Sequence, residues 1–394
     1  MTSPAAPGRL LTPRFVLVVT CGLFYFLALA MLTPVIPHYV EDDLGYGSLA
    51  VGIAVGAFAL GAIVIRAYFG KLGDRIGRRV LIIGGAAVVA VSTVFYGAVH
   101  ALWWLIALRV VTGFGEAAFF VGAATMITDL APVQRRGEAV SYWSVAVYGG
   151  LAFGPALGEF LRGNDRYTLT YLVSAGFAAL AAVLALFTRE VERDTTAPAS
   201  QHLLHRAAVG PGFVLFLGLI PLAGYSAFLP LYADDDLGIS SGGIFVLYGV
   251  LILLVRVIGA RVPDQLGGKR AGSLATAGAA LGIAIVALCA SVPGVIVGTI
   301  VFAGGMSLMY PALLLLALTG VSDADRASVV GTFSSFFDAS QGIGAFVCGA
   351  AAAAFGSDRA AFATGAVTAV CGLIFLNRMP ARGEAHTGDE VLPA

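Results

Sequence analysis

The sequence GKLGDRIGRR occupies residues 70–79 and stands between two long apolar runs, near 48–68 and 80–99. Four of its ten residues are lysine or arginine, and these residues concentrate in the cytoplasmic loops of membrane proteins. We expect Gly70 to let neighbouring helices approach and Gly77 to permit a turn that is closed to bulkier residues. The stretch therefore predicts a cytoplasmic loop between two membrane-spanning helices.

The composition of the whole chain also indicates a membrane protein. Apolar residues make up 59% of the 394 residues and charged residues only 12%, against roughly 25% charged residues in a typical soluble domain. So few charges cannot cover a water-soluble protein of this length, which excludes a soluble enzyme, a disordered protein and a nucleic-acid binder. The formal net charge is zero, so no acidic or basic partner is implied.

Motifs for nucleotide, metal or hydrolytic chemistry are missing from the sequence. It contains no glycine-rich phosphate loop followed by Lys-Ser or Lys-Thr, no metal-ligand spacing of histidines beside cysteines, and no nucleophile elbow. We therefore expect no cofactor, no metal and no enzymatic activity. The four cysteines lie inside apolar runs, so no disulfide framework is predicted.

Apolar runs long enough to cross a bilayer recur along the chain, since a spanning helix needs about 20 mostly apolar residues. They predict an all-α integral membrane protein with twelve spans, near 15–37, 48–68, 80–99, 102–126, 138–160, 168–188, 212–232, 242–260, 271–291, 294–319, 328–355 and 360–377. With the N-terminus inside, seventeen basic residues fall in cytoplasmic segments and three in outer loops. Both termini are therefore predicted in the cytoplasm, with the protein in the inner (plasma) membrane.

Two short matches indicate that the chain is a duplication. PHYVEDDLG at 37–45 matches PLYADDDLG at 230–238 at a shift of 193 residues. A second match, at a shift of 190, pairs Arg66, Asp74 and Gly77 with Arg256, Asp264 and Gly267. We predict a six-helix bundle at 1–188, a cytoplasmic linker at 189–211, and a second six-helix bundle with a short cytoplasmic tail at 212–394. Transporters built from parallel repeats bind substrate at mid-membrane between the halves.

The loop at 70–79 resembles the G-x-x-x-D-R-x-G-R-R loop of the major facilitator superfamily and lies where that family carries it. The resemblance implies a pair of pseudo-twofold-related six-helix bundles that alternate access. It also implies that Asp74 meets the start of the eleventh span, near Ser328, and that Arg78 pairs with Asp129. The alternative is a basic turn that only anchors the loop. The implied gating residues are Gly70, Asp74, Arg75, Gly77, Arg78, Arg79, Asp129 and Asp264.

The fifth predicted span contains GLAFGPALGE at 150–159, which resembles the G-x-x-x-G-P-x-x-G-G motif of the superfamily's antiporters. The resemblance implies export and an antiporter-type motif made of Gly150, Gly154, Pro155 and Gly158. Glycines four apart make a smooth face for close helix contact, so a general packing face is the alternative. Glu159 replaces the motif's final glycine, and we interpret it as an interfacial ion pair with Arg162 rather than a proton carrier.

Ionisable residues inside predicted spans are candidates for function, because each costs at least ~2.5–3.5 kcal/mol at mid-bilayer. On the fourth span, Arg109, Gly113 and Glu116 lie on one stripe and resemble the family's R-x-x-x-G motif, whose arginine is linked to proton coupling. We expect Glu116 to partner Arg109 directly or through water. A structural ion pair that only holds helices together remains the alternative.

Asp338 on the eleventh span has no basic residue within one turn of its own helix. It is interpreted either as a coupling or substrate-binding acid, or as a hydrogen-bond partner for another helix. Arg66 and Arg256 lie about one turn from the predicted cytoplasmic ends of their spans. We expect both to snorkel to the membrane surface and to support gating.

Aromatic residues near the middle of the predicted spans are candidates for a substrate cavity, with ordinary core packing as the alternative. They are Tyr25, Tyr148, Tyr225, Tyr310 and Phe337. The sequence as a whole predicts a monomeric, proton-coupled secondary transporter that contacts lipid and exports a small, partly apolar compound, such as a drug-like molecule or secondary metabolite. The alternatives are a sugar or metabolite transporter, including an importer, and a membrane receptor or scaffold that transports nothing.

Overall fold

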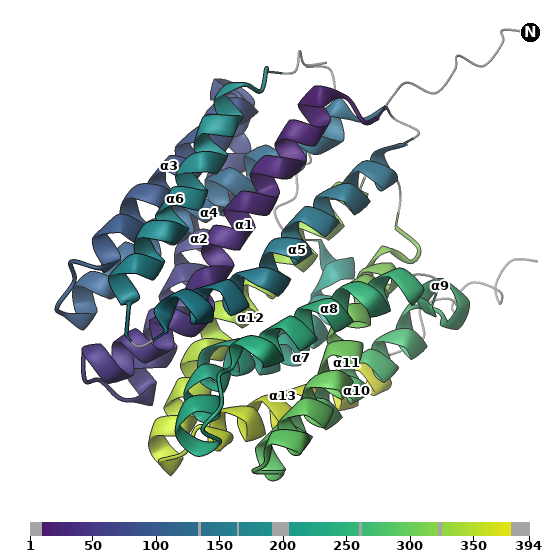
Figure 1. The fold of residues 1–394 in the computed structure, drawn as a ribbon. Coiled ribbons are helices and arrows are strands. Elements are labelled where there is room, and N and C mark those ends of the chain that lie inside the picture. Colours follow the sequence, from purple (N-terminus) through teal and green to yellow (C-terminus); the bar gives the residue numbers. More distant parts are fainter. Residues whose placement is uncertain are drawn as a thin grey trace, which may run out of the picture.

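The computed structural model describes residues 10–132, 135–163, 165–190, 205–259, 262–321 and 325–379. Within these ranges all regular structure is helical (Figure 1). The elements are α1 Pro13–His38, η1 Tyr39–Asp43, α2 Ser48–Ile76, α3 Arg78–Tyr96, α4 Leu102–Leu130, α5 Arg136–Arg162, α6 Tyr167–Leu186, α7 Arg206–Leu231, η3 Tyr232–Asp236, α8 Gly242–Ile258, α9 Val262–Leu266, α10 Gly268–Leu288, α11 Val292–Leu318, α12 Arg326–Phe355 and α13 Arg359–Arg378.

The helices confirm an all-helical protein with many potential membrane crossings. Among the described residues, ten helices are long and apolar enough to cross a membrane, and α8 is a shorter apolar helix. The count of twelve spans remains a prediction. One boundary differs clearly from its prediction, because α2 continues through most of the stretch predicted as a loop and ends only at Ile76. Gly77 follows with φ +98°, a conformation that residues with a side chain rarely adopt, so the turn is confined to that glycine.

The duplicated sequence segments adopt the same backbone conformation. Each of the matching stretches contains a five-residue π-helix, η1 after α1 and η3 after α7, and the two lie 193 residues apart. Each π-helix is followed by a glycine with positive φ, Gly45 at +71° and Gly238 at +63°. Gly77 and Gly267, 190 residues apart, also share this conformation. The equivalence of the two segments therefore extends from sequence to local structure.

Helices α1–α6 pack mainly on one another, as do α7–α13 (Figure 1). We call these groups the N set and the C set. The contacts between them run mainly through three pairs: α2 with α12, α5 with α8, and α1 with α7. The division into bundles at 1–188 and 212–394 remains a prediction.

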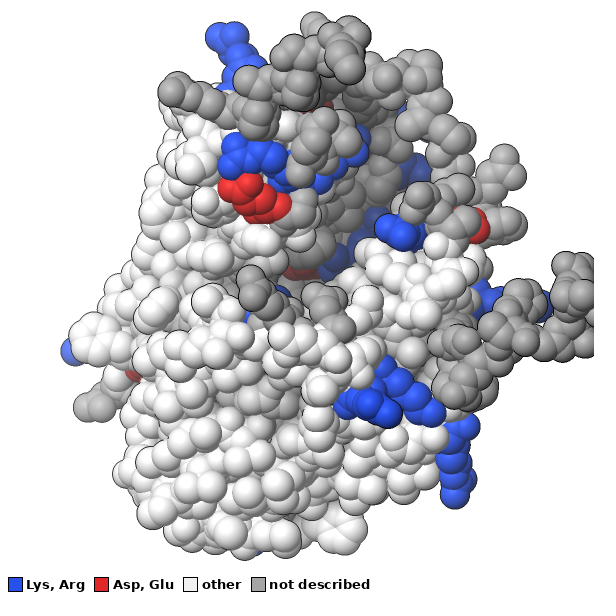
Figure 2. Space-filling model, turned by 90° about the vertical axis from the view of Figure 1, so that its right-hand side faces the viewer, with Lys and Arg blue, Asp and Glu red and all other residues white. Residues whose placement is uncertain are grey.

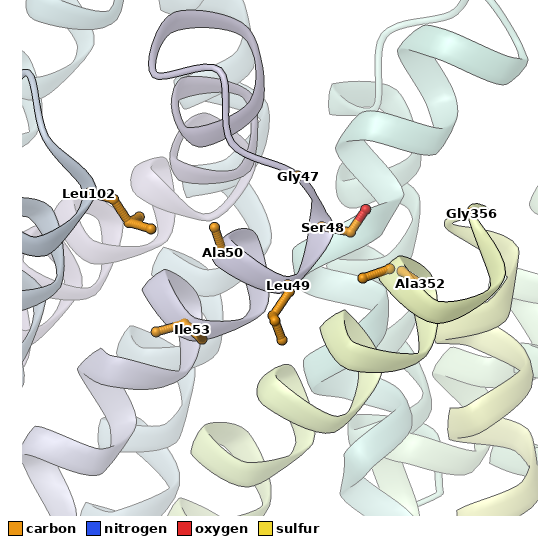
Figure 3. A pocket seen from close by; sticks show the side chains of 9 residues that line it. Gly47, Ser48, Leu49, Ala50, Ile53, Leu102, Ala352 and Gly356 are labelled. Carbon is orange, nitrogen blue, oxygen red and sulfur yellow. The ribbon is translucent and has the colours of Figure 1, made fainter.

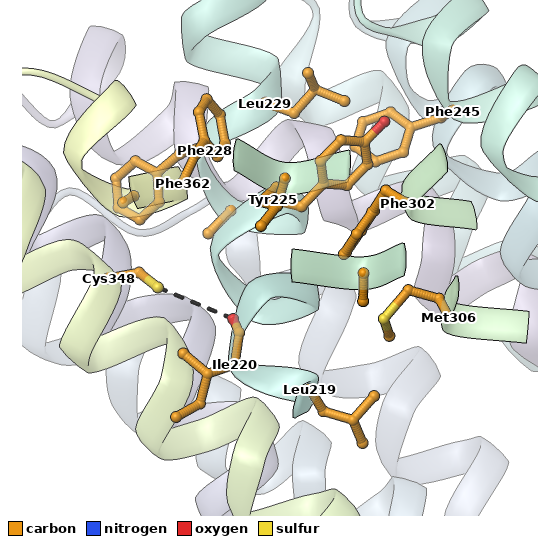
Figure 4. Close-up of a cluster of buried hydrophobic side chains, with 14 of the residues drawn as sticks. Leu219, Ile220, Tyr225, Phe228, Leu229, Phe245, Phe302, Met306, Cys348 and Phe362 are labelled. Carbon is orange, nitrogen blue, oxygen red and sulfur yellow. Dashed lines mark hydrogen bonds between the residues drawn. The ribbon is translucent and has the colours of Figure 1, made fainter. Parts of the chain in front are cut away.

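Each set has its own buried aromatic cluster. In the N set, Tyr25 stacks on Phe119 with ring centroids 3.6 Å apart. In the C set, Tyr225 contacts Phe245 and Phe302, and Figure 4 shows these rings together with the surrounding aliphatic side chains. Aromatic side chains bury large apolar areas. These clusters therefore make each set a packed unit rather than a loose collection of helices.

The two ends of the helix assembly differ in how closely the sets approach. We call the end with η1 and η3 the η end, and the opposite end, with Arg75, Arg78 and Arg79, the basic end. In the half of α2 near the η end, a Cβ on Gly52 would lie 2.5 Å from the carbonyl oxygen of Ala345 in α12. Towards the basic end, a Cβ on Gly70 would meet no described atom within 4 Å.

The sets are therefore closest at the η end. Gly70 does not mediate a close helix contact in this conformation, contrary to expectation, because α2 and α12 make their tight contacts further along the helices. Figure 2 shows that one side of the molecule is hollowed, with basic side chains gathered around the hollow.

Candidate functional site: a buried charged triad

One guanidinium and two carboxylates meet inside the helix assembly. The Arg66 Nη2 atom lies 2.9 Å from Glu116 Oε2, and Arg66 Nε lies 3.0 Å from Asp338 Oδ2. Arg66 Nη2 also donates a hydrogen bond to Asp338 Oδ1 at 3.3 Å. Arg66 belongs to α2 and Glu116 to α4, both in the N set, whereas Asp338 belongs to α12 in the C set. We call these three residues the triad.

Close helix packing brings the three side chains together. Glu116 is the middle residue of α4. Gly113, one turn before it, packs directly on the backbone of α2 at Phe58, with no room for a Cβ. Gly56 of α2 approaches α12 in the same way, since its Cβ would lie 2.5 Å from the Gly342 carbonyl oxygen. Gly342 lies one turn beyond Asp338, so the small residues of α4 and α12 carry both carboxylates to Arg66.

The triad carries one more negative charge than positive charge when both acids are ionised. Its side chains are largely buried, with exposed fractions of 23% for Arg66, 10% for Glu116 and 14% for Asp338. An uncompensated charge in a low-dielectric interior is costly. The arrangement can be neutralised by binding one proton, or by admitting one positively charged group. It is therefore a site that can exchange a proton for another cation.

Aromatic rings border the triad. The Arg66 guanidinium lies over the Phe120 ring at 5.0 Å from its centroid. Tyr25, one of the predicted cavity residues, is fully buried and interacts electrostatically with Glu116 and Arg66. Its hydroxyl has no hydrogen-bond partner among the described atoms. Rings that pack around a charged group exclude water and strengthen its electrostatic interactions.

The predicted roles of the two arginines nearest the triad were wrong in two respects. Arg66 does not snorkel to the surface, because two carboxylates hold its guanidinium. Arg109 does not pair directly with Glu116. Its Nε donates to the Ala54 carbonyl at 3.0 Å and its Nη2 to the Val55 carbonyl at 3.3 Å, both on α2. Within the described part of the chain Arg109 thus binds backbone oxygens, and its proton-coupling role remains a prediction.

Asp338 also differs from its prediction, because its basic partner comes from another helix. Two predicted cavity residues lie near it. The Tyr310 hydroxyl is 3.0 Å from Ser334 Oγ, one turn before Asp338, and the Tyr310 ring contacts Phe337 at 6.2 Å between centroids. These two aromatic side chains are therefore placed to meet a molecule that reaches the acid.

Tyr148 and Tyr225 occupy different environments. The Arg256 guanidinium of α8 lies 4.0 Å from the centroid of the Tyr148 ring of α5, which joins the two sets. Arg256 therefore stacks on an aromatic ring rather than snorkelling as expected. Tyr225 is fully buried, and its hydroxyl is 2.9 Å from Thr299 Oγ1. It packs in the aromatic cluster of Figure 4, so its position corresponds to the core-packing alternative.

At the basic end, the predicted pair between Arg78 and Asp129 is present. An unpredicted residue also holds this region. Glu190, just after α6, accepts hydrogen bonds from the backbone amides of Arg78 at 2.8 Å and Arg79 at 3.0 Å. A carboxylate at the start of α3 satisfies free amides and complements the helix dipole. Its only sequence signal was an acidic residue beside a basic segment.

Other predicted gating residues are less informative. The side chain of Arg79 donates to the Leu186 carbonyl at 2.6 Å, while Arg75 is exposed. Asp74 and Asp264 lie in helices, but their side chains fall outside the described part of the structure. The gating function of all these residues remains a prediction.

The glycines of the antiporter-type motif form the contact between α5 and α1. A Cβ on Gly150 would lie 2.6 Å from the Leu27 amide nitrogen, and Gly154 and Gly158 pack as tightly on Ala30 and Met31. Pro155 lies within the helix. The predicted pair of Glu159 with Arg162 is present, with Arg162 Nη2 3.1 Å from Glu159 Oε1. The motif therefore packs two helices, and its link to export remains a prediction.

Two surface hollows lie at the η end and are separate from the triad. One, of about 540 Å³, lies between the start of α2 and the end of α12. Figure 3 shows that small or apolar residues line it, among them Ser48, Ile53 and Ala352. The other, of about 380 Å³, is polar and includes Arg162 and Asp234. Within the described residues, no group of side chains is arranged to hold a metal ion.

Comparison with known sequences connects this geometry to a family. The family model described as Major Facilitator Superfamily matches residues 18–345. An uncharacterised MFS-type transporter of Salmonella typhimurium is 27% identical over 326 residues, which cover 80% of this chain and 84% of that protein.

Two further relatives are named for drug resistance. Multidrug resistance protein 1 of Bacillus subtilis is 28% identical over 233 residues, covering 56% of this chain and 59% of that protein. The quinolone resistance protein NorA of Staphylococcus aureus is 25% identical over 237 residues, covering 56% of this chain and 61% of that protein. The match therefore spans about three fifths of the length of these two relatives.

Solved structures share the fold. The crystal structure of the nucleoside transporter NupG has a TM-score of 0.74 at 13% identity and covers 93% of this chain and 98% of its own. A bacterial homologue of the human lysosomal transporter Spinster, in an inward-facing and unoccupied conformation, has a TM-score of 0.72 at 18% identity. That match covers 92% of this chain and 94% of the homologue. At these identities the likeness concerns the fold alone.

Proposed function

The chain belongs to the major facilitator superfamily, and we propose that it is a proton-coupled secondary transporter that exports a small, partly apolar compound such as a drug-like molecule or secondary metabolite. It does so by alternating access between two six-helix bundles with twelve spans in the plasma membrane, both termini being cytoplasmic. The observation that carries the proposal is the triad, because it places an excess buried negative charge on the contact between the N set and the C set.

The triad couples protonation to the contact between the sets. When Asp338 is ionised, Arg66 attracts it and holds α12 against α2. A proton on Asp338 removes that attraction, and a proton on Glu116 frees the guanidinium to pair more fully with Asp338. Each protonation state therefore favours a different strength of contact between the sets. A transporter needs such a link, because the ion must change the relative free energies of its conformations.

The substrate class follows from the groups beside the triad. Tyr310 and Phe337 offer an apolar surface next to Asp338, and Tyr148 adds another ring stacked under Arg256. A molecule with an apolar body and one polar or cationic group would match these surroundings. The direction of transport is supported by the glycine-rich contact of α5 with α1 and by the two relatives named for drug resistance.

Reconstitution into proteoliposomes with an imposed pH gradient tests the proposal. The wild-type protein and the variants Glu116→Gln and Asp338→Asn would be compared with a fluorescent cationic dye, a quinolone, a nucleoside and a sugar. We expect gradient-driven flux of the dye or quinolone to fall at least about tenfold in each variant, the loss produced by roughly 1.4 kcal/mol of coupling energy. Asp165→Asn, an exposed carboxylate at the η end, is the matched control and should leave flux unchanged.

Substrate exchange without a gradient separates coupling from binding. A variant that has lost only coupling keeps exchange while losing gradient-driven accumulation. If every substrate still accumulates in both triad variants, the coupling assignment is wrong. Gradient-driven uptake of the nucleoside or sugar alone would replace the exporter by the alternative transporter. A protein that moves none of the four compounds, with or without a gradient, would contradict the transporter proposal.

A further inference from the structure

Oppositely charged groups join the two sets at the η end. Arg162 at the end of α5 places Nη2 3.2 Å from Asp234 Oδ2 in η3, and 3.1 Å from Glu159 Oε1 in its own helix. His38 at the end of α1 lies beside the same aspartate, with Nε2 4.0 Å from Asp234 Oδ2. Two basic groups of the N set thus face one carboxylate of the C set.

His38 is held in a defined position by its second nitrogen. Its Nδ1 lies 3.1 Å from Asp42 Oδ2, and the same Asp42 oxygen accepts a hydrogen bond from the Tyr167 hydroxyl of α6 at 3.2 Å. The residue is only 1% exposed, and Nε2 has no hydrogen-bond partner among the described atoms. A proton on the imidazole would make both nitrogens donors and would add attraction towards Asp42 and Asp234.

Acidic groups face one another across the same interface a short distance away. Asp358, just before α13 in the C set, interacts electrostatically with Glu41 of η1 in the N set and with Asp235 and Asp236 of η3. Burial, and then repulsion by these carboxylates, raises the pKa of Asp358 to about 7. The neighbouring Arg359 directs its guanidinium to the Ala287 and Leu288 carbonyls, at 2.8 and 3.1 Å.

We propose that His38, Arg162, Asp234 and Asp358, with Glu41 opposite, form a pH-sensitive latch that holds the η end closed when the medium on that side is acidic and releases it when the medium is alkaline. We call this group the η-end latch. Charge distribution places this end outside the cell, so the latch responds to the external medium. The inference does not depend on the role assigned to the triad.

Both titrating groups act in the same direction. In the closed form, Asp358 is buried against Glu41, so it binds a proton more tightly than it would after the sets part and water enters. His38 likewise binds a proton more tightly while Asp234 is close. The form that binds protons more tightly is favoured as pH falls. The other charged groups around His38, namely Asp42, Asp235, Arg162 and Glu159, belong to elements packed at the same end.

The latch can be tested by measuring the opening of the η end directly. Nitroxide labels on Tyr46→Cys, before α2, and Ser240→Cys, before α8, would report the distance between the sets by pulsed electron resonance, because both positions are exposed. The exposed Cys289 and Cys371 would first be replaced by serine. Between about pH 8 and pH 5.5, we expect the ratio of short to long distances to rise about tenfold, the change given by one pKa unit of preference.

Variants assign that response to named groups. Asp358→Asn should stay in the short-distance form at alkaline pH, and Asp234→Asn should favour the long-distance form throughout while keeping part of the pH response. His38→Gln combined with Asp358→Asn should give a ratio that no longer changes with pH. Asp165→Asn, which lies 3.9 Å from Arg162 but outside the latch, should respond like the wild-type protein. A flat wild-type ratio, or a response that survives in the His38 and Asp358 double variant, overturns the proposal.

Discussion

The triad and the η-end latch use the same pair of chemical groups at different depths. Each joins an arginine of the N set to an aspartate of the C set, Arg66 with Asp338 and Arg162 with Asp234, at 3.0 and 3.2 Å. Asp338 is 14% exposed, whereas Asp234 is 49% exposed. Because water screens the second pair and not the first, an unbalanced charge costs far more in the triad. Depth, rather than pair geometry, therefore separates a coupling site from a latch.

Truncating the two arginines is the most direct way to break this comparison. Arg66→Ala leaves two carboxylates buried without a counter-charge, and removing one partner of a buried pair typically costs about 3–5 kcal/mol. Arg162→Ala should cost at most about 1 kcal/mol, since Asp234 is half exposed. Thermal unfolding in detergent at neutral pH measures both.

Adding Asp338→Asn to Arg66→Ala should recover much of the lost stability, because it removes one of the stranded charges. Equal losses for the two arginine variants, or no recovery in the double variant, would show that depth does not distinguish the two sites.

The second prediction concerns the two ends of α2. A leucine at Gly52 would meet the α12 backbone within 3 Å, whereas a leucine at Gly70 would enter space with no described atom within 4 Å. Overpacking costs about 1–3 kcal/mol where neighbours cannot move. We expect Gly52→Leu to lower the unfolding temperature or to push the labelled η end open, and Gly70→Leu to do neither. The reverse order would mean that the sets are closest at the basic end.

The smallest expected effect is the pH dependence contributed by Asp358. An acid whose folded-state pKa is raised destabilises the fold once it ionises, so its penalty develops as pH rises from about 4, the usual aspartate value, to about 7. Asp358→Asn should therefore raise the unfolding temperature at pH 8 by about 2 °C, equivalent to roughly 1 kcal/mol. At pH 4 it should have no effect. A gain confined to acidic pH would have the wrong sign for a raised pKa.

Local features of the fold were predictable because they depend on neighbouring residues. Apolar runs predicted the helices, and the positive-φ glycine at Gly77 was expected from the turn it closes. The repeat predicted that segments 193 residues apart would share a conformation, which the two π-helices confirm. The end of α2 was misplaced because lysine, aspartate and arginine favour a loop by charge but remain compatible with a helix.

The candidate site was only half predictable. Glu116 and Asp338 were identified because an acid inside an apolar run is costly wherever it lies. Arg66 was misjudged because its distance from the end of its predicted span indicated a surface position, whereas α2 extends to Ile76 and leaves it inside the assembly. Arg109 was favoured instead because it shares a helix stripe with Glu116, yet its guanidinium binds carbonyls of α2.

The sequence alone determined that the chain is helical, apolar and internally repeated, because hydrophobic length and backbone preference act over a few residues at a time. Only the tertiary structure decided which guanidinium meets which carboxylate, since Arg66 is 50 residues from Glu116 and 272 residues from Asp338. Those partners meet where small residues let α2 approach α4 and α12. Pairing across helices depends on how closely backbones pack, and that packing is a property of the assembled chain.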